Sequence, residues 1–321
     1  MNNNLGGKKI LFVAYNFFNY HVEIKKKLEE LGAEVDMFEQ VKYSLMYTIL
    51  LRMHLGEKYM YLLANRIINA AKQKKYDYVF VLEIKQHETF YQKLRELQTT
   101  AKFILYYWDS INFFDYRPFL KFFHKAYSFD IEDTNTNTNI NYQPLFYIDA
   151  YEKIRNQATI TYKYDFLQVA SFSEERYKKM KNFILKSGID VSRIYICYVS
   201  TFANYLSLML KGYDMSWVSW RNKSQKEITN LYRESKCILD FDKKHQTGLS
   251  MRTIESLGAG KKIVTANAKL KAEPIYSPEN IFILGEDNID ELKTFLEKDF
   301  VSNDKIEDYS LANWCLKLFA F

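Results

Sequence analysis

Short apolar runs of strand length recur along the chain, separated by longer segments that have the periodicity of amphipathic helices. The first run, Lys9–Tyr15, is followed by a helical pattern over Val22–Leu31, a stop at Gly32 and a second run at Val35–Phe38. Apolar runs between helices are typical of parallel strands that are buried on both faces. This opening therefore predicts a β–α–β unit and an α/β fold.

The same alternation continues in two series, which a polar connector divides. Further strands are predicted at Tyr78–Leu82, Phe103–Trp108, Ala126–Phe129, Phe166–Phe172, Arg193–Val199, Ile238–Phe241, Lys262–Thr265 and Ile281–Leu284. We interpret Thr134–Asn141 as a surface loop and the segment from Pro144 as the connector. The pattern predicts two doubly wound, Rossmann-like α/β domains that face a cleft, over residues 1–150 and 151–304.

Helix signals agree with this organisation. A long helical region is predicted over Tyr43–Lys75, with a break at Gly56. Ser224 followed by Glu227 three positions later predicts a capping box at the start of another helix. A final amphipathic helix is predicted over Asp308–Phe319.

Composition limits the class of protein. The chain has 321 residues, 48% of them hydrophobic and 26% charged, which is typical of a packed globular protein. The net charge of +6 permits anionic partners and selects none of them. Three widely spaced cysteines form no zinc motif and favour a reducing compartment. We find no signal-peptide pattern and no apolar stretch near the ~20 residues of a membrane span, so we expect a cytoplasmic protein.

The stretch Cys237–Asn267 carries the most specific chemistry. It predicts a strand, a polar loop, a helix from about Leu249 to Leu257, a glycine-containing stop and a second strand. Arg252 and Glu255 lie three residues apart on that helix, away from its apolar residues. A cation and a carboxylate beside a helix N-terminus suit the diphosphate and the ribose of a nucleotide. The alternative is an ordinary ion pair on a solvated helix face.

This stretch resembles the donor-binding region of GT-B glycosyltransferases of bacterial capsule, lipopolysaccharide or exopolysaccharide assembly. The resemblance is carried by Gly248, Glu255, the turn Gly258–Gly260 and Thr265–Asn267. It implies that the helix binds a nucleotide sugar and that residues 305–321 form a C-terminal helix packing back on the first domain. Donor contacts are then expected from Gly248, Leu249, Ser250, Arg252, Thr253, Glu255, Asp242, Lys244, Ser171 and Arg176.

One departure from the family pattern concerns stereochemistry. Many retaining members carry a second glutamate eight positions before the ribose glutamate, and Thr247 stands there in this chain. Retaining and inverting transfer therefore both stay open.

Acidic and basic residues around the helix have competing interpretations. Asp240 and Asp242 form a DxD pair, which holds a divalent metal in another glycosyltransferase class. We instead expect one acid at the cleft, the other at the core, and no metal. Lys244 could reach a phosphate or be solvated. Ser171–Arg176 follows a predicted strand and suits phosphate contact through Arg176, or it is a helix cap with surface charge.

The first domain offers two candidates for a general base. His21 follows the first strand, and Asp109 follows the strand Phe103–Trp108, so both are expected at the carboxyl ends of the strands. A base is needed for an inverting transfer to an acceptor hydroxyl. Each residue also has a structural interpretation, His21 as a helix-entry residue and Asp109 as a turn cap.

The segment Arg117–Tyr127 mixes basic and aromatic residues. It suits peripheral contact with the inner face of a membrane, where a lipid-linked acceptor would be found, or packing in the core. No nucleic-acid-binding motif occurs, and the motifs of nicotinamide dehydrogenases, P-loop enzymes and α/β-hydrolases are absent.

We therefore expect a metal-independent glycosyltransferase, without cofactors, that moves a sugar from a nucleotide-sugar donor to a saccharide or lipid-linked acceptor. Two alternatives share the donor site: a nucleotide-sugar epimerase, and a non-catalytic nucleotide-sugar-binding scaffold subunit.

Overall fold

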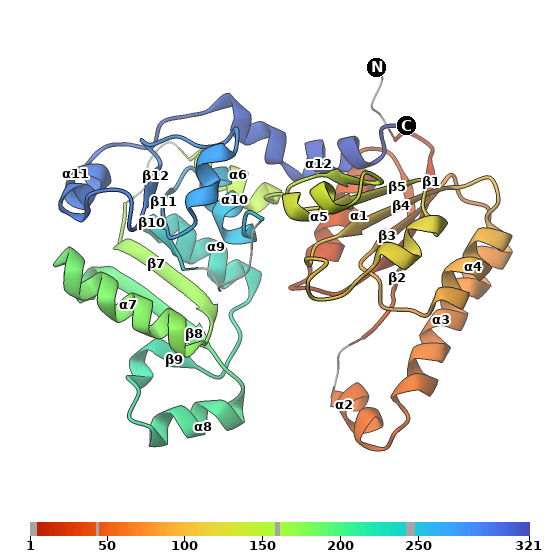
Figure 1. Ribbon diagram of the computed structural model, residues 1–321, viewed down its shortest axis with the longest axis horizontal. Helices are drawn as coiled ribbons and strands as arrows, with labels where there is room; N and C mark the ends of the chain where they lie inside the picture. Colours follow the sequence, from red (N-terminus) through yellow and green to blue (C-terminus); the bar gives the residue numbers. More distant parts are fainter. Residues whose placement is uncertain (1–4, 43–44, 158–160, 242–247) are drawn as a thin grey trace. The chain divides into compact units, whose positions relative to one another are not determined.

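The computed structural model describes residues 5–42, 45–157, 161–241 and 248–321. The chain forms two compact units (Figure 1). Unit 1 comprises Met1–Leu145 and Leu311–Phe321, and unit 2 comprises Phe146–Ser310. The C-terminal segment is therefore part of the same unit as the N-terminal half of the chain.

Unit 1 is a parallel six-stranded sheet with helices on its faces (Figure 1). The strands lie in the order β2-β1-β3-β4-β5-β6. They span Lys9–Ala14 (β1), Glu34–Glu39 (β2), Tyr78–Leu82 (β3), Lys102–Tyr107 (β4), Lys125–Ser128 (β5) and Ile140–Tyr142 (β6). The helices are Tyr20–Glu30 (α1), Leu45–Arg52 (α2), Gly56–Gln73 (α3), Glu88–Leu97 (α4), Ile131–Thr136 (α5) and Leu311–Leu318 (α12).

Successive residues of the central strands of unit 1 enter two different hydrophobic layers, as the alternation of a strand requires. Val79 and Val81 of β3 belong to one cluster of buried side chains. Phe80, between them, stacks on Phe12 at 4.9 Å and contacts Trp314 of α12. Because Trp314 is fully buried, α12 is an integral part of the core of unit 1.

Unit 2 is a second parallel six-stranded sheet, with the strand order β12-β11-β10-β7-β8-β9. The strands span Tyr164–Ser171 (β7), Ile194–Val199 (β8), Val218–Ser219 (β9), Ser235–Asp240 (β10), Lys262–Thr265 (β11) and Ile281–Ile283 (β12). The helices are Asp149–Arg155 (α6), Glu174–Ser187 (α7), Phe202–Leu210 (α8), Gln225–Glu234 (α9), Met251–Gly258 (α10) and Leu292–Glu297 (α11). The predicted class, α/β with two parallel Rossmann-like sheets, is confirmed.

Two local predictions are confirmed and one is wrong. The capping box of Ser224 and Glu227 opens α9, and the predicted break at Gly56 separates α2 from α3. The tract Thr134–Asn141 is not a loop throughout, because it contributes to α5 and to the edge strand β6. Its polar residues are tolerated because a short helix and an edge strand both face solvent.

Among the residues that the structure describes, no helix is both long enough and apolar enough to cross a bilayer.

Candidate functional site

The carboxyl end of β10 and the start of α10 form the centre of the predicted donor region in unit 2. Asp240 is the last residue of β10, which lies between β7 and β11 in the sheet. The loop residues 242–247, which include Asp242, Lys244 and Thr247, lie outside the described residues. Gly248 and Leu249 are buried and lead directly into Ser250, the N-cap of α10.

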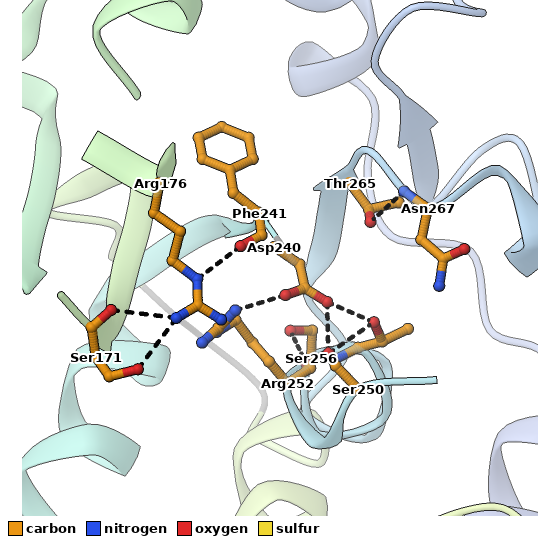
Figure 2. Close-up of polar contacts among 10 residues, drawn as sticks. Ser171, Arg176, Asp240, Phe241, Ser250, Arg252, Ser256, Thr265 and Asn267 are labelled. Carbon is orange, nitrogen blue, oxygen red and sulfur yellow. Dashed lines mark hydrogen bonds and ion pairs between the residues drawn. The ribbon is translucent and has the colours of Figure 1, made fainter. Parts of the chain in front are cut away.

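The carboxylate of Asp240 fixes the first turn of α10 (Figure 2). It is fully buried and accepts hydrogen bonds from the hydroxyls of Ser250 and Thr253, the latter at 2.7 Å. Arg252 donates to its other oxygen as an ion pair. Ser250 Oγ also accepts from the backbone N–H of Thr253 at 3.1 Å, which caps the helix. Three predicted donor residues thus converge on one acid.

These contacts change the roles expected for Ser250, Thr253 and Asp240. The two hydroxyls are used inside the protein to hold Asp240, so they position the helix. Asp240, the first acid of the DxD pair, is directed at α10 and is buried. Arg252 remains partly exposed, so part of its guanidinium faces solvent.

Arg176 links the ends of two strands in unit 2 (Figure 2). Its Nε donates to the carbonyl oxygen of Phe241 at 2.8 Å, and its Nη1 donates to the carbonyl oxygen and hydroxyl of Ser171 at 3.2 and 3.1 Å. Arg176 is 7% exposed. The guanidinium is occupied by carbonyl and hydroxyl oxygens of the protein, which argues against the phosphate contact; that contact stays a prediction. Ser171 itself is exposed at the end of β7.

The interpretation of Arg252 and Glu255 as a pair on a solvated face is wrong. Glu255 is only 5% exposed and lies near the buried phenol of Tyr232. Of the apolar residues of α10, Ile254 and Leu257 are fully buried and Met251 is partly buried. A buried carboxylate is costly unless it serves structure or ligand binding, so Glu255 remains a residue of functional interest.

The end of α10 explains why glycines occur there. A Cβ at Gly258 would lie 2.3 Å from Cγ of Tyr147, so only glycine permits the helix to approach this ring. Gly260 has φ +66°, in the left-handed region that allows the chain to turn into β11. Beyond β11, the side chain of Asn267 caps a short 3₁₀ helix at Ala268–Ala272.

In unit 1, His21 is at the predicted end of the sheet but is not presented to solvent. Its ring is buried in the first turn of α1, and Nε2 lies 3.1 Å from Oε1 of Glu39 at the end of β2. Burial lowers the pKa of His21, against the opposing effect of Glu39. Burial of the imidazole argues against the role of His21 as a base that touches the acceptor, which stays a prediction.

Asp109 has the exposure that His21 lacks. Asp109 follows β4 and is exposed. Partial desolvation of its carboxyl raises the pKa of Asp109, and the charge of Lys85 opposes this shift. Its backbone N–H donates to Oε1 of Glu83 at 3.2 Å. Of the two predicted bases, Asp109 alone combines the expected position with accessibility.

The segment Arg117–Tyr127 packs on the core of unit 1, as the second of its two interpretations predicts. Its aromatic and aliphatic residues pack against the core of unit 1, through Phe119, Leu120, Phe122 and Phe123. The basic residues Arg117 and Lys121 form ion pairs with Asp115 and Glu88.

Two site residues were missed as functional candidates in the sequence. In the sequence, Asp240 stands out only as half of a DxD pair, although an acid at the end of an apolar strand before a Ser-x-x-Thr helix start is a usable signal. Glu83 directly follows β3, and nothing in VFVLEIK distinguishes it from a residue that starts a surface loop.

No protein-family model matches the chain, and no curated protein matches it either. Solved structures match nearly its whole length. AviGT4, a glycosyltransferase involved in avilamycin A biosynthesis, has a TM-score of 0.59 at 12% identity, covering 97% of this chain and 95% of that one. An α-glucosyltransferase in complex with UDP and a 13-mer DNA has a TM-score of 0.55 at 12% identity, with the same coverage.

The lipopolysaccharide outer core galactosyltransferase WaaB has a TM-score of 0.50 at 13% identity, covering 97% of this chain and 98% of that one. The chain has the GT-B glycosyltransferase fold. At these identities the likeness defines the GT-B fold, and the chemistry has to be argued from the residues of the site.

Proposed function

We propose that this chain is a glycosyltransferase that moves a sugar from a nucleotide-sugar donor to a saccharide acceptor, which is lipid-linked, in bacterial surface polysaccharide assembly. One observation carries the proposal: in a GT-B fold, Asp240 locks the start of α10, where Arg252 and Glu255 stand. A pre-organised helix start with a cation beside it suits a nucleoside diphosphate.

In the proposed donor complex, Arg252 contacts the diphosphate and Glu255 accepts hydrogen bonds from the ribose hydroxyls. The ion pair with Asp240 fixes the guanidinium in advance, so little side-chain entropy is lost on binding. Two structures of similar fold were solved with UDP, the α-glucosyltransferase and HepE of Anabaena, which has a TM-score of 0.50 at 13% identity. A uridine nucleotide is therefore the first donor to test.

The acceptor is proposed to bind to unit 1, where Asp109 removes the proton of the attacking hydroxyl. The O–H bond breaks as the new glycosidic bond forms, and the nucleoside diphosphate leaves with the electron pair of the old bond. Arg252 stabilises the negative charge that develops on the diphosphate. The proposal includes no metal, because the carboxylate of Asp240 is engaged by Ser250, Thr253 and Arg252.

Peripheral membrane contact belongs to the same proposal, but α8 supports it better than Arg117–Tyr127 does. Four residues at helical spacing form an exposed apolar stripe on α8: Phe202, Leu206, Met209 and Leu210. The ring of Trp220, also exposed, lies 5.7 Å from Phe202. Residues 211–227 include four basic residues and two acidic residues, Asp214 and Glu227, of which Glu227 pairs with Arg221. An apolar stripe with a basic surround suits an anionic lipid surface.

Sedimentation with vesicles tests the membrane part. Leu210→Glu is expected to reduce binding to vesicles of phosphatidylglycerol and phosphatidylcholine, whereas Leu185→Glu, at an equally exposed leucine of α7, is not. Equal binding by both variants, or none by the native chain, would remove α8 from the proposal.

A panel of nucleotide sugars with a lipid-linked acceptor tests the activity itself. Transfer of the sugar supports the proposal. Interconversion of the free donor would identify an epimerase, and binding without turnover of any donor would identify a scaffold subunit.

A further inference from the structure

Glu83 combines two unfavourable features at one residue. Its side chain is fully buried, and its backbone has φ +69°, in the left-handed region that non-glycine residues seldom adopt. Buried carboxylates and strained backbone each cost free energy, and such residues gather at functional sites. Glu83 directly follows β3, at the carboxyl end of the sheet of unit 1.

Neighbouring groups hold the backbone of Glu83 in this conformation. Its N–H donates to the carbonyl oxygen of Tyr106 in β4 at 3.0 Å. Its own carbonyl oxygen accepts from Nε2 of the buried Gln40 at 3.0 Å. Gln40 in turn accepts from the hydroxyl of Tyr91 at 2.9 Å. The strained conformation is therefore imposed from both sides.

The side chain of Glu83 is directed at the loop that follows β4. Oε1 accepts from the backbone N–H of Trp108 at 2.9 Å and from that of Asp109 at 3.2 Å. Oε2 lies 3.4 Å from Nζ of Lys85, whose ammonium also stands over the ring of Tyr15 at 4.6 Å. One buried carboxylate thus fixes two successive amides, and the second amide belongs to the candidate base.

We infer that Glu83 is a positioning residue: its carboxylate oxygen fixes the Trp108–Asp109 turn and so holds Asp109 toward the acceptor. This inference rests on the proposed function in assigning a base to Asp109. The link between Glu83 and the turn is independent of that assignment. The raised pKa of Glu83, about 7, has burial as its main cause and repulsion by Asp109 as a further one, opposed by Lys85 and by the Trp108 amide.

Hydrogen–deuterium exchange of the full-length protein tests the link without any substrate. Glu83→Ala removes the acceptor of two amides, so the peptide that covers Trp108 and Asp109 is expected to exchange faster. Glu83→Gln keeps an acceptor oxygen of the same shape and should restore most of the protection. Glu88→Ala, an exposed glutamate at the start of α4, should change nothing there.

Turnover tests the consequence, with the donor sugar and acceptor that give transfer in the panel. Asp109→Asn is expected to lower kcat by at least about 100-fold, as loss of a general base does. Glu83→Ala should lower kcat by at least about 10-fold, and Glu83→Gln should recover most of that loss. If Glu83 acts through Asp109, Glu83→Ala in the Asp109→Asn background should cause little further loss.

Three results would overturn the inference. They are unchanged exchange of the Trp108–Asp109 peptide in Glu83→Ala, equal loss in the Gln and Ala variants, and losses that multiply in the double variant. UDP affinity reports on unit 2 and should stay unchanged in all of these variants. Native protein that neither binds nor turns over a nucleotide sugar would reject the proposed function, while the exchange experiment would still decide the link between Glu83 and the turn.

Discussion

Arg252 donates from Nη1 to Oδ1 of Asp240, which joins the first turn of α10 to the end of β10. The same carboxylate accepts from the hydroxyls of Ser250 and Thr253. Because Asp240 has no exposed surface, its charge depends on these donors for stabilisation. The helix start of the candidate site is therefore fixed before any ligand arrives.

Asp240→Asn is expected to lower the free energy of unfolding by about 2–4 kcal/mol. The amide group keeps the shape of the side chain, but one of its two positions cannot accept a hydrogen bond, and Arg252 loses its charged partner. Urea denaturation measures the change. Asp190→Asn serves as a control, because this exposed side chain caps a 3₁₀ turn that asparagine can also cap, so its stability should be nearly unchanged. Equal effects of the two substitutions would contradict the role given to Asp240.

Gly258→Ala is expected to destabilise unit 2 by about 1–3 kcal/mol, although alanine normally favours a helix over glycine by about 1 kcal/mol. The added methyl would overlap the ring of Tyr147, which is buried and has little room to move. Gly212→Ala is the matched control, because it adds backbone strain at φ +73° with no atom within 4 Å. Gly212→Ala is expected to lower the free energy of unfolding by about 1 kcal/mol, the cost of placing a non-glycine residue in the left-handed region. Stabilisation by Gly258→Ala would refute the packing argument.

The two parallel α/β sheets could be anticipated because apolar runs such as Lys9–Tyr15 and Phe103–Trp108 have few other stable arrangements in a globular domain. The elements that were not anticipated are the helices α5, α6 and α8 and the short strands β6 and β9. Most apolar residues of α8 face solvent and only Leu208 is buried, so its pattern is not that of a helix packed on a sheet. The strand β9 has only two residues.

The site was predicted by position more successfully than by role. Ser250, Arg252 and Thr253 do contact the end of β10, since a helix that follows a parallel strand must start there. Their partner Asp240 and the burial of Arg176 and His21 depend on side-chain packing between segments far apart in the sequence. Periodicity contains no information about such packing.

The stability of the Glu83→Gln variant relative to native protein should depend on pH. The folded pKa of Glu83, about 7, is above the ordinary value of 4.5, so the folded state retains a proton that the unfolded state has lost between these values. The contribution of Glu83 to the free energy of unfolding is fully present below about pH 4.5 and is lost as the pH rises through 7. Glutamine does not titrate. The free energy of unfolding of Glu83→Gln, relative to that of the native protein, should therefore rise by on the order of 3 kcal/mol between pH 4.5 and 8.

Urea denaturation at pH 5 and pH 8 measures this difference, with Glu88→Gln as the control at an exposed position. A difference between native protein and Glu83→Gln that is the same at both pH values would show that Glu83 titrates normally.

Removal of divalent metals is expected to leave transfer unchanged, because the proposed site stabilises the diphosphate with Arg252 and the start of α10. Turnover is measured in the presence of EDTA, and then after addition of Mg²⁺ or Mn²⁺. Activity that EDTA abolishes and Mn²⁺ restores would return the DxD pair to the site as a metal ligand.

Binding of UDP, measured by isothermal titration calorimetry, tests the central claim most directly. Native protein should bind UDP, and Glu255→Gln should bind it at least about tenfold more weakly, since hydrogen bonds to a charged acceptor contribute about 1.5–3 kcal/mol. Glu297→Gln, an exposed residue at the end of α11, should bind UDP as the native chain does. Equal affinity of the Glu255→Gln and native proteins, with both folded, would contradict the assignment of α10 as the nucleotide-binding helix.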